Sequence, residues 1–535
     1  MDSRSQHIYR KVCIFQIVAV ILSMGGLSLI APGPMIGDEV GHFYLLKAIA
    51  DNLPDLTLTY HIPVAWSDIA MERYCNHTFL WHIIGALVYR VLPWVFSVQL
   101  YHLLFFAQFL TVFYLFARDF THRDYFCVCW ALMLMWSIPM FLLFGTLFYK
   151  DVPVAAQIIT VFYLIYRRKY SLSLMFWILA LLLKETAVIM LPALLFYYIW
   201  RLHRVRAKMY VMVAASVLLT ELTFVTEGMI LTQVLPHTTP LIVEQLQAVV
   251  PWLGPVSRIA ASSPETVEGG NCPGNLNILY NWLIYPGIGF WFGLWMAVVG
   301  AVWRLTRASR LSPLDWRVIV DSYGVISLLI AFSYIIPATM VLWPNNCDIR
   351  YYCPAMPFLI FSFAYWSGDL LRRMRWLLPL AAIILILQTG LVFHKIVKMR
   401  NLSPGIRGTI EFLEKQHAII PEGRIFMYPE GNSRFFPYEA VWTRDNLYFD
   451  IMKADNRQRA AIWLNHRVVF VVVRKYMVSG AAPDVARFGS YPAAFVADLY
   501  KDRRRFPVLL ENEQMVVFGI RNCRKTEKTA LKNHR

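Results

Sequence analysis

Apolar stretches of about 15 to 25 residues recur along this chain and stop near position 394. Stretches of this kind are typical of helices that cross a bilayer, whose hydrocarbon core needs about 20 apolar residues. Eleven can be drawn, at 13–31, 97–117, 124–146, 150–166, 171–184, 186–200, 210–228, 279–303, 318–342, 354–370 and 375–394. The pattern predicts a mainly α-helical, polytopic membrane bundle of about eleven transmembrane helices in residues 1–394.

The composition excludes a soluble fold for a chain as apolar as this one. Hydrophobic residues make up 58% of the sequence and charged residues only 16%, whereas soluble domains average about 45–50% apolar and about 25% charged residues. A soluble domain has too little interior to bury so much apolar surface. Because the long apolar stretches end near position 394, we expect residues 395–535 to form a separate, water-facing domain.

Basic residues set the expected orientation of the bundle. Lys and Arg cluster in six short polar breaks, at Arg10–Lys11, Arg118 with Arg123, Arg167–Lys169, Arg201–Lys208, Arg304–Arg317 and Arg372–Arg375. Threading eleven spans places all six breaks on the same face. Because cytoplasmic loops collect Lys and Arg, this face is predicted to be cytoplasmic, with the N-terminus inside and the C-terminal domain outside.

The stretch 79–96, FLWHIIGALVYRVLPWVF, is apolar enough to be a further span. Counting it as one would place the later basic breaks on the outer face, against the charge rule. We therefore predict an amphipathic helix that lies at the outer membrane surface, anchored by Trp81 and Trp94. This helix belongs to a first outer loop at 32–96.

Ionisable residues gather at the predicted outer ends of the spans. They are Asp38 and Glu39 after the first span, Lys150 and Asp151 in FYKDVP, Lys184 and Glu185 in LLLKETAVIML, and Arg350 in NNCDIRYYCPAMPF. A Lys or Asp at the centre of a membrane helix costs about 2.5–3.5 kcal/mol, so such residues usually face a polar cavity or reach to the interface.

Each group also has a purely structural interpretation. Solvated loop charges are the commoner explanation for an acidic pair such as Asp38–Glu39, and Asp151 suits the first turn of a helix. The Lys184–Glu185 pair separates two apolar runs of about 15 residues, which at 1.5 Å per residue barely reach the interface. Taken together, the groups predict one outward pocket in which a carboxylate accepts a proton from a hydroxyl and cations stabilise a departing phosphate.

The order of these motifs resembles the membrane glycosyltransferases of the C superfamily (GT-C). The resemblance is strongest to the dolichyl-phosphate-mannose-protein mannosyltransferase-like and lipid A aminoarabinose transferase-like branches, and it covers roughly residues 12–394. The matching parts are Gly37-Asp38-Glu39, a surface helix in the first loop, FYKDVPVAAQIITVFYLIYRR, LLLKETAVIMLPALLFYYIW and IRYYCPAMPFLIF. The chain departs from the pattern at Asn76–Leu80, where the protein mannosyltransferases have a start like His-Pro-Pro, so the acceptor class stays open.

The resemblance implies inverting transfer of one sugar from a polyprenyl- or dolichyl-phosphate donor to a glycan, lipid or protein acceptor on the outer face. It implies that Asp38 is the general base, that Glu39 orients a substrate, and that Lys184 and Arg350 bind the donor phosphate. His42 is a further candidate. The residues implied in donor-phosphate and substrate binding are Asp151, Lys150, Lys184, Glu185, Arg350 and Tyr351.

A metal cofactor is not expected to be required. Cys75, His77, His42 and Glu72 form no tightly spaced ligand set such as CxxC or HExxH, and isolated His residues usually have ordinary hydrogen-bond partners. A divalent metal in the first loop remains the less favoured alternative. No nucleic-acid-binding motif is present, so we expect membrane lipids and the donor and acceptor as partners.

The region 395–535 is predicted to be a small α/β domain. A helical pattern at Gly408–Gln416 alternates with the strand-like runs RIFMYP, RVVFVVV and QMVVFGI. About half of the chain's 51 Lys and Arg lie here, and they account for much of the net charge of +17. Attraction to anionic lipid headgroups or to an anionic glycan is one interpretation, and a solvated basic surface is the other.

Two other classes of protein are compatible with intramembrane charges. A transporter or lipid-carrier flippase would line a translocation path with them, but such proteins often show internal repeats and midplane charges, and neither is evident here. A noncatalytic scaffold would tolerate loss of Asp38. We expect an enzyme in the bacterial inner (plasma) membrane with a periplasmic C-terminal domain, or in the endoplasmic reticulum membrane if the host is eukaryotic.

Overall fold

We describe the protein from a computed structural model of the 535-residue chain. The residues that the structure describes are 3–30, 42, 46, 49–50, 80–93, 95–146, 149–234, 287–308, 323–342, 352–374, 376–400, 404–428, 439–441, 454–465, 467–475 and 491–521. Its contacts divide the chain into two compact units. Helices α1 to α19 belong to the first unit, and α20 with all the elements that follow it belongs to the second.

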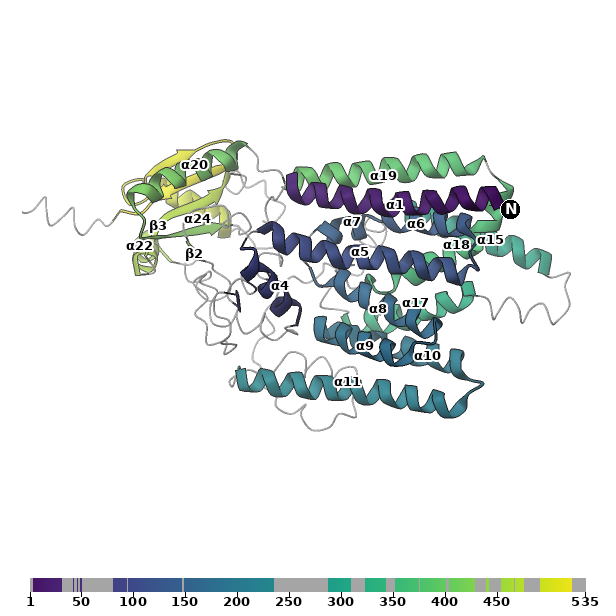
Figure 1. Ribbon diagram of the computed structural model, residues 1–535. Helices are drawn as coiled ribbons and strands as arrows, with labels where there is room; N and C mark the ends of the chain where they lie inside the picture. Colours follow the sequence, from purple (N-terminus) through teal and green to yellow (C-terminus); the bar gives the residue numbers. More distant parts are fainter. Residues whose placement is uncertain are drawn as a thin grey trace, which may run out of the picture. The chain divides into compact units, whose positions relative to one another are not determined.

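The long helices of the first unit run roughly parallel to one another in Figure 1. Each predicted apolar stretch overlaps one of its helices, or two where a stretch is interrupted, as at Ile138 between α6 and α7. The elements are α1 (Ser3–Ile30), α4 (Leu80–Val91), α5 (Val95–Phe120), α6 (Tyr125–Ser137), α7 (Pro139–Thr146), α8 (Asp151–Tyr166), α9 (Tyr170–Leu183), the 3₁₀ helix η1 (Glu185–Met190), α10 (Leu191–Leu202), α11 (Arg206–Val234), α15 (Gly287–Ala308), α17 (Tyr323–Leu342), α18 (Met356–Arg373) and α19 (Leu377–Arg400).

Three stretches among the described helices are long and apolar enough to cross a membrane. They are Arg4–Leu27, Ser97–Phe120 and Arg206–Phe224. Further apolar helices of 10–17 residues accompany them, including those of α6, α8 and α9. A mostly helical membrane bundle with a small sheet is therefore confirmed, whereas the number of eleven crossings and the assignment of the faces stay predictions.

Helices α8 and α9 form an antiparallel hairpin that positions the candidate site. The turn at Arg167–Lys169 is tight, with Arg168 in the left-handed region at φ 60°, and the Lys169 amide donates to the Leu164 carbonyl at 2.8 Å. Because the hairpin is antiparallel, the N-terminal end of α8 and the C-terminal end of α9 meet at its open end. Residues 150 and 184 lie there.

Helix α5 packs beside α8 and runs in the same direction. Midway along the pair, Gln108 of α5 bonds Gln157 of α8, and towards the C-terminal ends Asp119 of α5 bonds Arg167 just after α8. Partners that advance together along both helices require a parallel arrangement. The N-terminal ends of α5 and α8 therefore lie at the same end of the bundle.

Aromatic side chains fill the contact between α5 and α18. The ring of Phe361 stacks on Phe113 with centroids 4.6 Å apart and meets Phe116 edge-on at 5.2 Å. On the other side of α18 the backbone itself is the contact, because a Cβ on Gly300 of α15 would overlap the Trp366 carbonyl oxygen. Small residues permit such close approach between membrane helices, where dispersion contacts replace the hydrophobic effect.

The predicted surface helix at 79–96 is α4, which ends before Pro93. Its Trp81, His82, Gly85 and Ala86 are buried, whereas Leu87 and Val91 are 50% and 78% exposed. With 12 residues it is about 18 Å long, too short for a core of about 30 Å. The helix and its amphipathic character are confirmed, and its place at the membrane surface stays a prediction. The predicted anchoring by Trp81 is wrong, because this side chain is fully buried in the protein.

The second unit contains a five-stranded sheet in the order β2-β1-β3-β5-β4. Strand β1 is parallel to β2 and β3, and β5 is antiparallel to β3 and β4. The strand-like runs of the sequence are β1, β3 and β5. The elements are α20 (Pro404–Ile419), β1 (Arg424–Tyr428), β2 (Glu439–Val441), α22 (Asn456–Asn465), β3 (Val468–Arg474), α24 (Tyr491–Lys501), β4 (Val508–Glu511) and β5 (Met515–Gly519).

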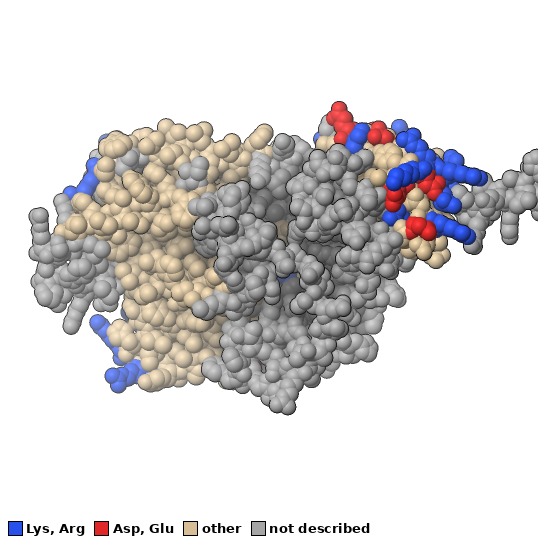
Figure 2. Space-filling model, turned by 180° about the vertical axis from the view of Figure 1, so that it is seen from behind, with Lys and Arg blue, Asp and Glu red and all other residues tan. Residues whose placement is uncertain are grey.

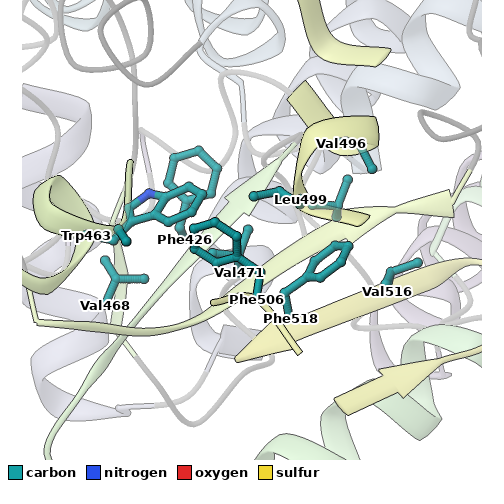
Figure 3. Packing of buried hydrophobic residues seen from close by; sticks show 11 residues of the cluster. Phe426, Trp463, Val468, Val471, Val496, Leu499, Phe506, Val516 and Phe518 are labelled. Carbon is teal, nitrogen blue, oxygen red and sulfur yellow. The ribbon is translucent and has the colours of Figure 1, made fainter. Parts of the chain in front are cut away.

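Successive side chains along each strand point to opposite faces of the sheet, and both faces carry an apolar layer. Val471, Phe518 and their same-face neighbours pack against Trp463 of α22 and Leu499 of α24, as Figure 3 shows. Helix α20 contacts β5, where Asn512 Nδ2 donates to the Gly405 carbonyl at 2.8 Å. Helices on both faces give this unit its own core, which a β-hairpin alone would lack.

Candidate functional site

The structure places only part of the predicted site. Lys150, Asp151, Lys184 and Glu185 belong to the described residues. Asp38, Glu39, Arg350 and Tyr351 lie outside them, so their predicted roles are untested. The same holds for Cys75, His77 and Glu72 of the alternative metal set.

Two predicted groups that are far apart in the sequence meet at the open end of the α8–α9 hairpin. Lys184 Nζ donates to Asp151 Oδ1 at 2.6 Å. The two side chains are 11% and 5% exposed. A charge-assisted bond of this length between buried groups is strong, and each charge offsets the desolvation of the other.

Local backbone structure explains why these residues reach each other. Asp151 is the first residue of α8, where a carboxylate is favoured by the positive end of the helix dipole. Lys184 follows the last residue of α9 in an extended conformation, φ −159° and ψ 128°, before η1 begins. This single extended residue interrupts the helical path, and its side chain reaches across to α8.

Lys150 adds a second buried cation beside the ion pair. It is the residue before Asp151 and is 3% exposed, and its carbonyl accepts the Val154 amide at 3.0 Å. Lys150 and the Lys184–Asp151 pair thus bring two buried ammonium groups to the N-terminal end of α8. The helix dipole is positive at this end, which favours an anion there.

The segment after Lys184 connects this end to a third part of the bundle. The 3₁₀ helix η1, which starts at Glu185, packs against α9, α10 and α17. On α17, Thr339 bonds the hydroxyl of Tyr352 at 3.0 Å. Tyr352 directly follows the predicted Arg350–Tyr351 segment, and its own hydrogen bond was not anticipated from the sequence.

A polar contact between α5 and α8 was also missed. The amide side chains of Gln108 and Gln157 bond each other reciprocally at 3.2 and 3.1 Å, and Gln108 also donates to Thr160 Oγ1 at 3.2 Å. The signal was present, because Gln157 and Thr160 are three residues apart in an apolar span, the spacing of one helix face. Their partner could not be identified without the packing of α5.

The opposite end of α8 carries a different group of charges around Asp119. Its carboxylate accepts bonds from Arg118 Nε and Arg167 Nη1, both at 2.7 Å, and from the Tyr163 hydroxyl at 3.2 Å. The Asp119 carboxylate raises the pKa of Arg167 above its ordinary value. The arginine side chains are 25% and 52% exposed, and no cation there is buried as Lys184 is.

No group of three or more His, Cys, Asp or Glu side chains suited to a metal ion occurs among the residues that the structure describes. The described carboxylate at the hairpin's open end, Asp151, is engaged by Lys184. The two buried ammonium groups and the positive end of the α8 dipole suit an anion better than a metal cation.

Comparisons with known proteins give fold-level similarity. No protein-family model matches the sequence, and no curated protein matches it. ArnT from Cupriavidus metallidurans, determined bound to undecaprenyl phosphate, matches with a TM-score of 0.55 and 13% identity over 94% of this chain and 97% of that chain. The Archaeoglobus fulgidus oligosaccharyltransferase, in complex with zinc and sulfate, matches with a TM-score of 0.49 and 11% identity over 92% of this chain and 71% of that chain. The similarity to ArnT shows a shared fold.

Proposed function

We propose, starting from the GT-C-like fold that the chain shares with ArnT, that it is a membrane glycosyltransferase that takes its sugar from a polyprenyl-phosphate donor. The single observation that carries the proposal is the buried Lys184–Asp151 pair with Lys150 at the N-terminal end of α8. Undecaprenyl phosphate is bound to ArnT in the structure named above. Buried ammonium groups at the positive end of a helix dipole suit the phosphate of such a donor.

The donor phosphate would be held by Lys150 and Lys184, with Asp151 fixing the position of Lys184. When the bond between sugar and phosphate breaks, the leaving phosphate gains negative charge. Cations already in place stabilise this charge in a site of low dielectric constant, where their effect is larger than in water. Arg350, Tyr351 and Glu185 complete the proposed binding set.

Asp38 is the proposed general base, and Glu39 orients a substrate. An acceptor hydroxyl would give its proton to Asp38 while its oxygen forms a bond to the anomeric carbon. The bond from that carbon to the phosphate oxygen breaks on the opposite face, and its electron pair leaves with the lipid phosphate. This in-line step inverts the anomeric configuration and needs no oxidant or metal.

The acceptor is a glycan, lipid or protein hydroxyl on the outer face of the membrane. The C-terminal unit lies on that face in the proposed topology, because the six basic breaks are on the other one. A bacterial inner membrane with a periplasmic C-terminal domain fits this arrangement.

The test is sugar transfer from a panel of polyprenyl-phosphate sugars by purified protein in lipid nanodiscs. Wild type is compared with Asp38→Asn and with a matched control, Asp119→Asn, which removes a carboxylate at the other end of α8. We expect Asp38→Asn to lower turnover by about 10²–10⁴-fold, the range for a lost general base, while donor binding is kept. Asp119→Asn should retain transfer.

Two outcomes would overturn parts of the proposal. Full activity of Asp38→Asn would exclude Asp38 as the base. Absence of transfer with every donor, together with movement of a lipid-linked sugar across sealed vesicles, would replace the enzyme with a flippase.

A further inference from the structure

The turn between α24 and β4 is built to present arginines outward. Its sequence, Lys501 to Phe506, is KDRRRF. The Asp502 carboxylate accepts the Arg505 amide at 3.2 Å and the Arg505 guanidinium at 2.5 Å, and the Asp502 carbonyl accepts the Phe506 amide at 2.8 Å. Phe506 is fully buried in the core, so both ends of the turn are fixed.

Arg503 and Arg504 project from this fixed turn. Both are exposed, and the Arg503 guanidinium lies 5.7 Å from the centre of the Tyr500 ring. Within the described residues neither arginine forms an ion pair. The turn therefore carries two positive charges outside the ion pairs of the described residues.

Further cations come to the same edge of the domain from neighbouring elements. The Arg521 amide, just after β5, donates to the Arg505 carbonyl at 3.0 Å. Asn456 at the start of α22 donates to the Asp498 carbonyl of α24 at 2.7 Å, which brings Arg457 near α24. We call the exposed set Arg457, Lys501, Arg503, Arg504 and Arg521 the basic edge.

The nearby carboxylates are already engaged. Asp498 accepts Arg459 at 3.3 Å and Lys501 at 3.2 Å, and Asp502 is bound by Arg505. Asp455 caps α22 through the amides of residues 457 and 458, both at 2.8 Å, and these bonds lower its pKa. Figure 2 shows blue side chains gathered over this unit with fewer red ones among them, so the basic edge keeps a net positive charge.

We propose that the basic edge binds the headgroups of anionic phospholipids in the bilayer that holds the helical bundle. The planar guanidinium group of arginine can donate two hydrogen bonds to the oxygens of one phosphate, and each Lys or Arg adds attraction at an anionic membrane surface. In the sequence, only three residues separate Arg400, the end of α19, from Pro404, the start of α20, so the domain is tethered near that bilayer. Cations spread over three elements fit many phosphates on a surface better than one phosphate in a pocket.

The test uses the full chain in two kinds of nanodisc, one of phosphatidylcholine alone and one that also contains phosphatidylglycerol. Amide hydrogen exchange of residues 501–506 is followed in each. We expect slower exchange with phosphatidylglycerol, reversed by high salt because exposed charges are screened. The Arg503→Gln, Arg504→Gln double variant should lower the ratio of docked to undocked domain roughly 25-fold, about fivefold for each arginine.

A matched control removes the same charge from the other face of the sheet. Arg407→Gln with Lys415→Gln alters two exposed cations of α20, and it should leave the exchange in phosphatidylglycerol nanodiscs unchanged. Equal exchange in both lipids, or equal effects of the two double variants, would overturn the proposal. Slower exchange caused only by an added soluble anionic polysaccharide would overturn it in favour of a glycan surface.

Discussion

Helix α8 has charged groups at both ends, but the two groups are built differently. At the N-terminal end one carboxylate, Asp151, serves buried Lys184. At the C-terminal end one carboxylate, Asp119, is shared by two partly exposed arginines and a tyrosine. Water can replace a lost partner at the second end and not at the first. The comparison teaches that burial, and not the number of ion pairs, decides where a charge is indispensable.

The largest expected effect is at the buried end. Asp151→Ala leaves the Lys184 ammonium buried without its carboxylate, and loss of one partner of a buried pair costs about 3–5 kcal/mol. Thermal unfolding in nanodiscs, followed by loss of native tryptophan fluorescence, measures this. If Asp151→Ala lowered thermal stability no more than Asp119→Asn does, the proposed difference between the two ends of α8 would be wrong.

Removing both charges separates stability from function. Asp151→Leu with Lys184→Met should recover most of the stability that Asp151→Ala loses, because apolar residues of similar volume often replace a buried pair at little cost. Sugar transfer should stay lost, since the proposed phosphate contact is gone. If the double variant transferred sugar at the wild-type rate, the pair would be purely structural.

A smaller effect is expected at the other end of the helix. Asp119→Asn removes the charge that Arg118 and Arg167 share, but both guanidinium groups reach solvent, so the loss should be about 1–2 kcal/mol. The same unfolding assay applies. Added salt should reduce the difference from wild type, because exposed ion pairs are screened, whereas the Asp151→Ala difference should persist.

The neutral contact between the two ends should contribute less again. Gln157→Leu breaks the reciprocal amide bonds with Gln108, and polar contacts between membrane helices average about 0.6 kcal/mol. A second change, Gln108→Leu in the same chain, should restore part of the loss. A cost above that of Asp119→Asn would place more of the α5–α8 stability in the middle than at the ends.

The smallest effect is expected in the turn that follows α8. Arg168 has φ 60°, which glycine adopts more readily than residues with a Cβ. Arg168→Gly should raise stability by about 0.5 kcal/mol, since greater flexibility of the unfolded chain offsets part of the relieved strain. A matched change at Lys169, which has a negative φ of −95°, should lower stability.

The sequence predicted the helices and the proximity of Lys184 to Asp151, whereas the roles of the site residues stay predictions. Apolar length and basic breaks are local signals, so each predicted stretch overlaps a helix of the bundle, although helix ends differ by up to ten residues, as at the start of α1. Lys150, Asp151, Lys184 and Glu185 were predicted to converge, and the structure joins Asp151 to Lys184. Which carboxylate Lys184 binds could not be predicted, because Glu185 was its neighbour in the sequence and Asp151 is its neighbour across the hairpin.

Contacts between helices could not be predicted from the sequence for a related reason. Gln108 and Gln157 are each visible as a polar residue in an apolar span, but their pairing depends on the register of α5 against α8. The interruption at Ile138 between α6 and α7 has instead a local cause, because Ile138 precedes Pro139 and is extended, with ψ 117°, as the residue before a proline tends to be. The predicted roles of Asp38 and Arg350 stay predictions, as both residues lie outside the described part of the chain.

The close approach of α15 and α18 limits which sequences can keep this bundle. At position 300 any side chain would displace the carbonyl of Trp366 and with it the backbone of α18. A Cβ on Gly390 of α19 would meet no described atom within 4 Å. Natural variation among proteins of this lineage should therefore be nearly absent at position 300 and free at position 390, although both residues are glycines in apolar helices.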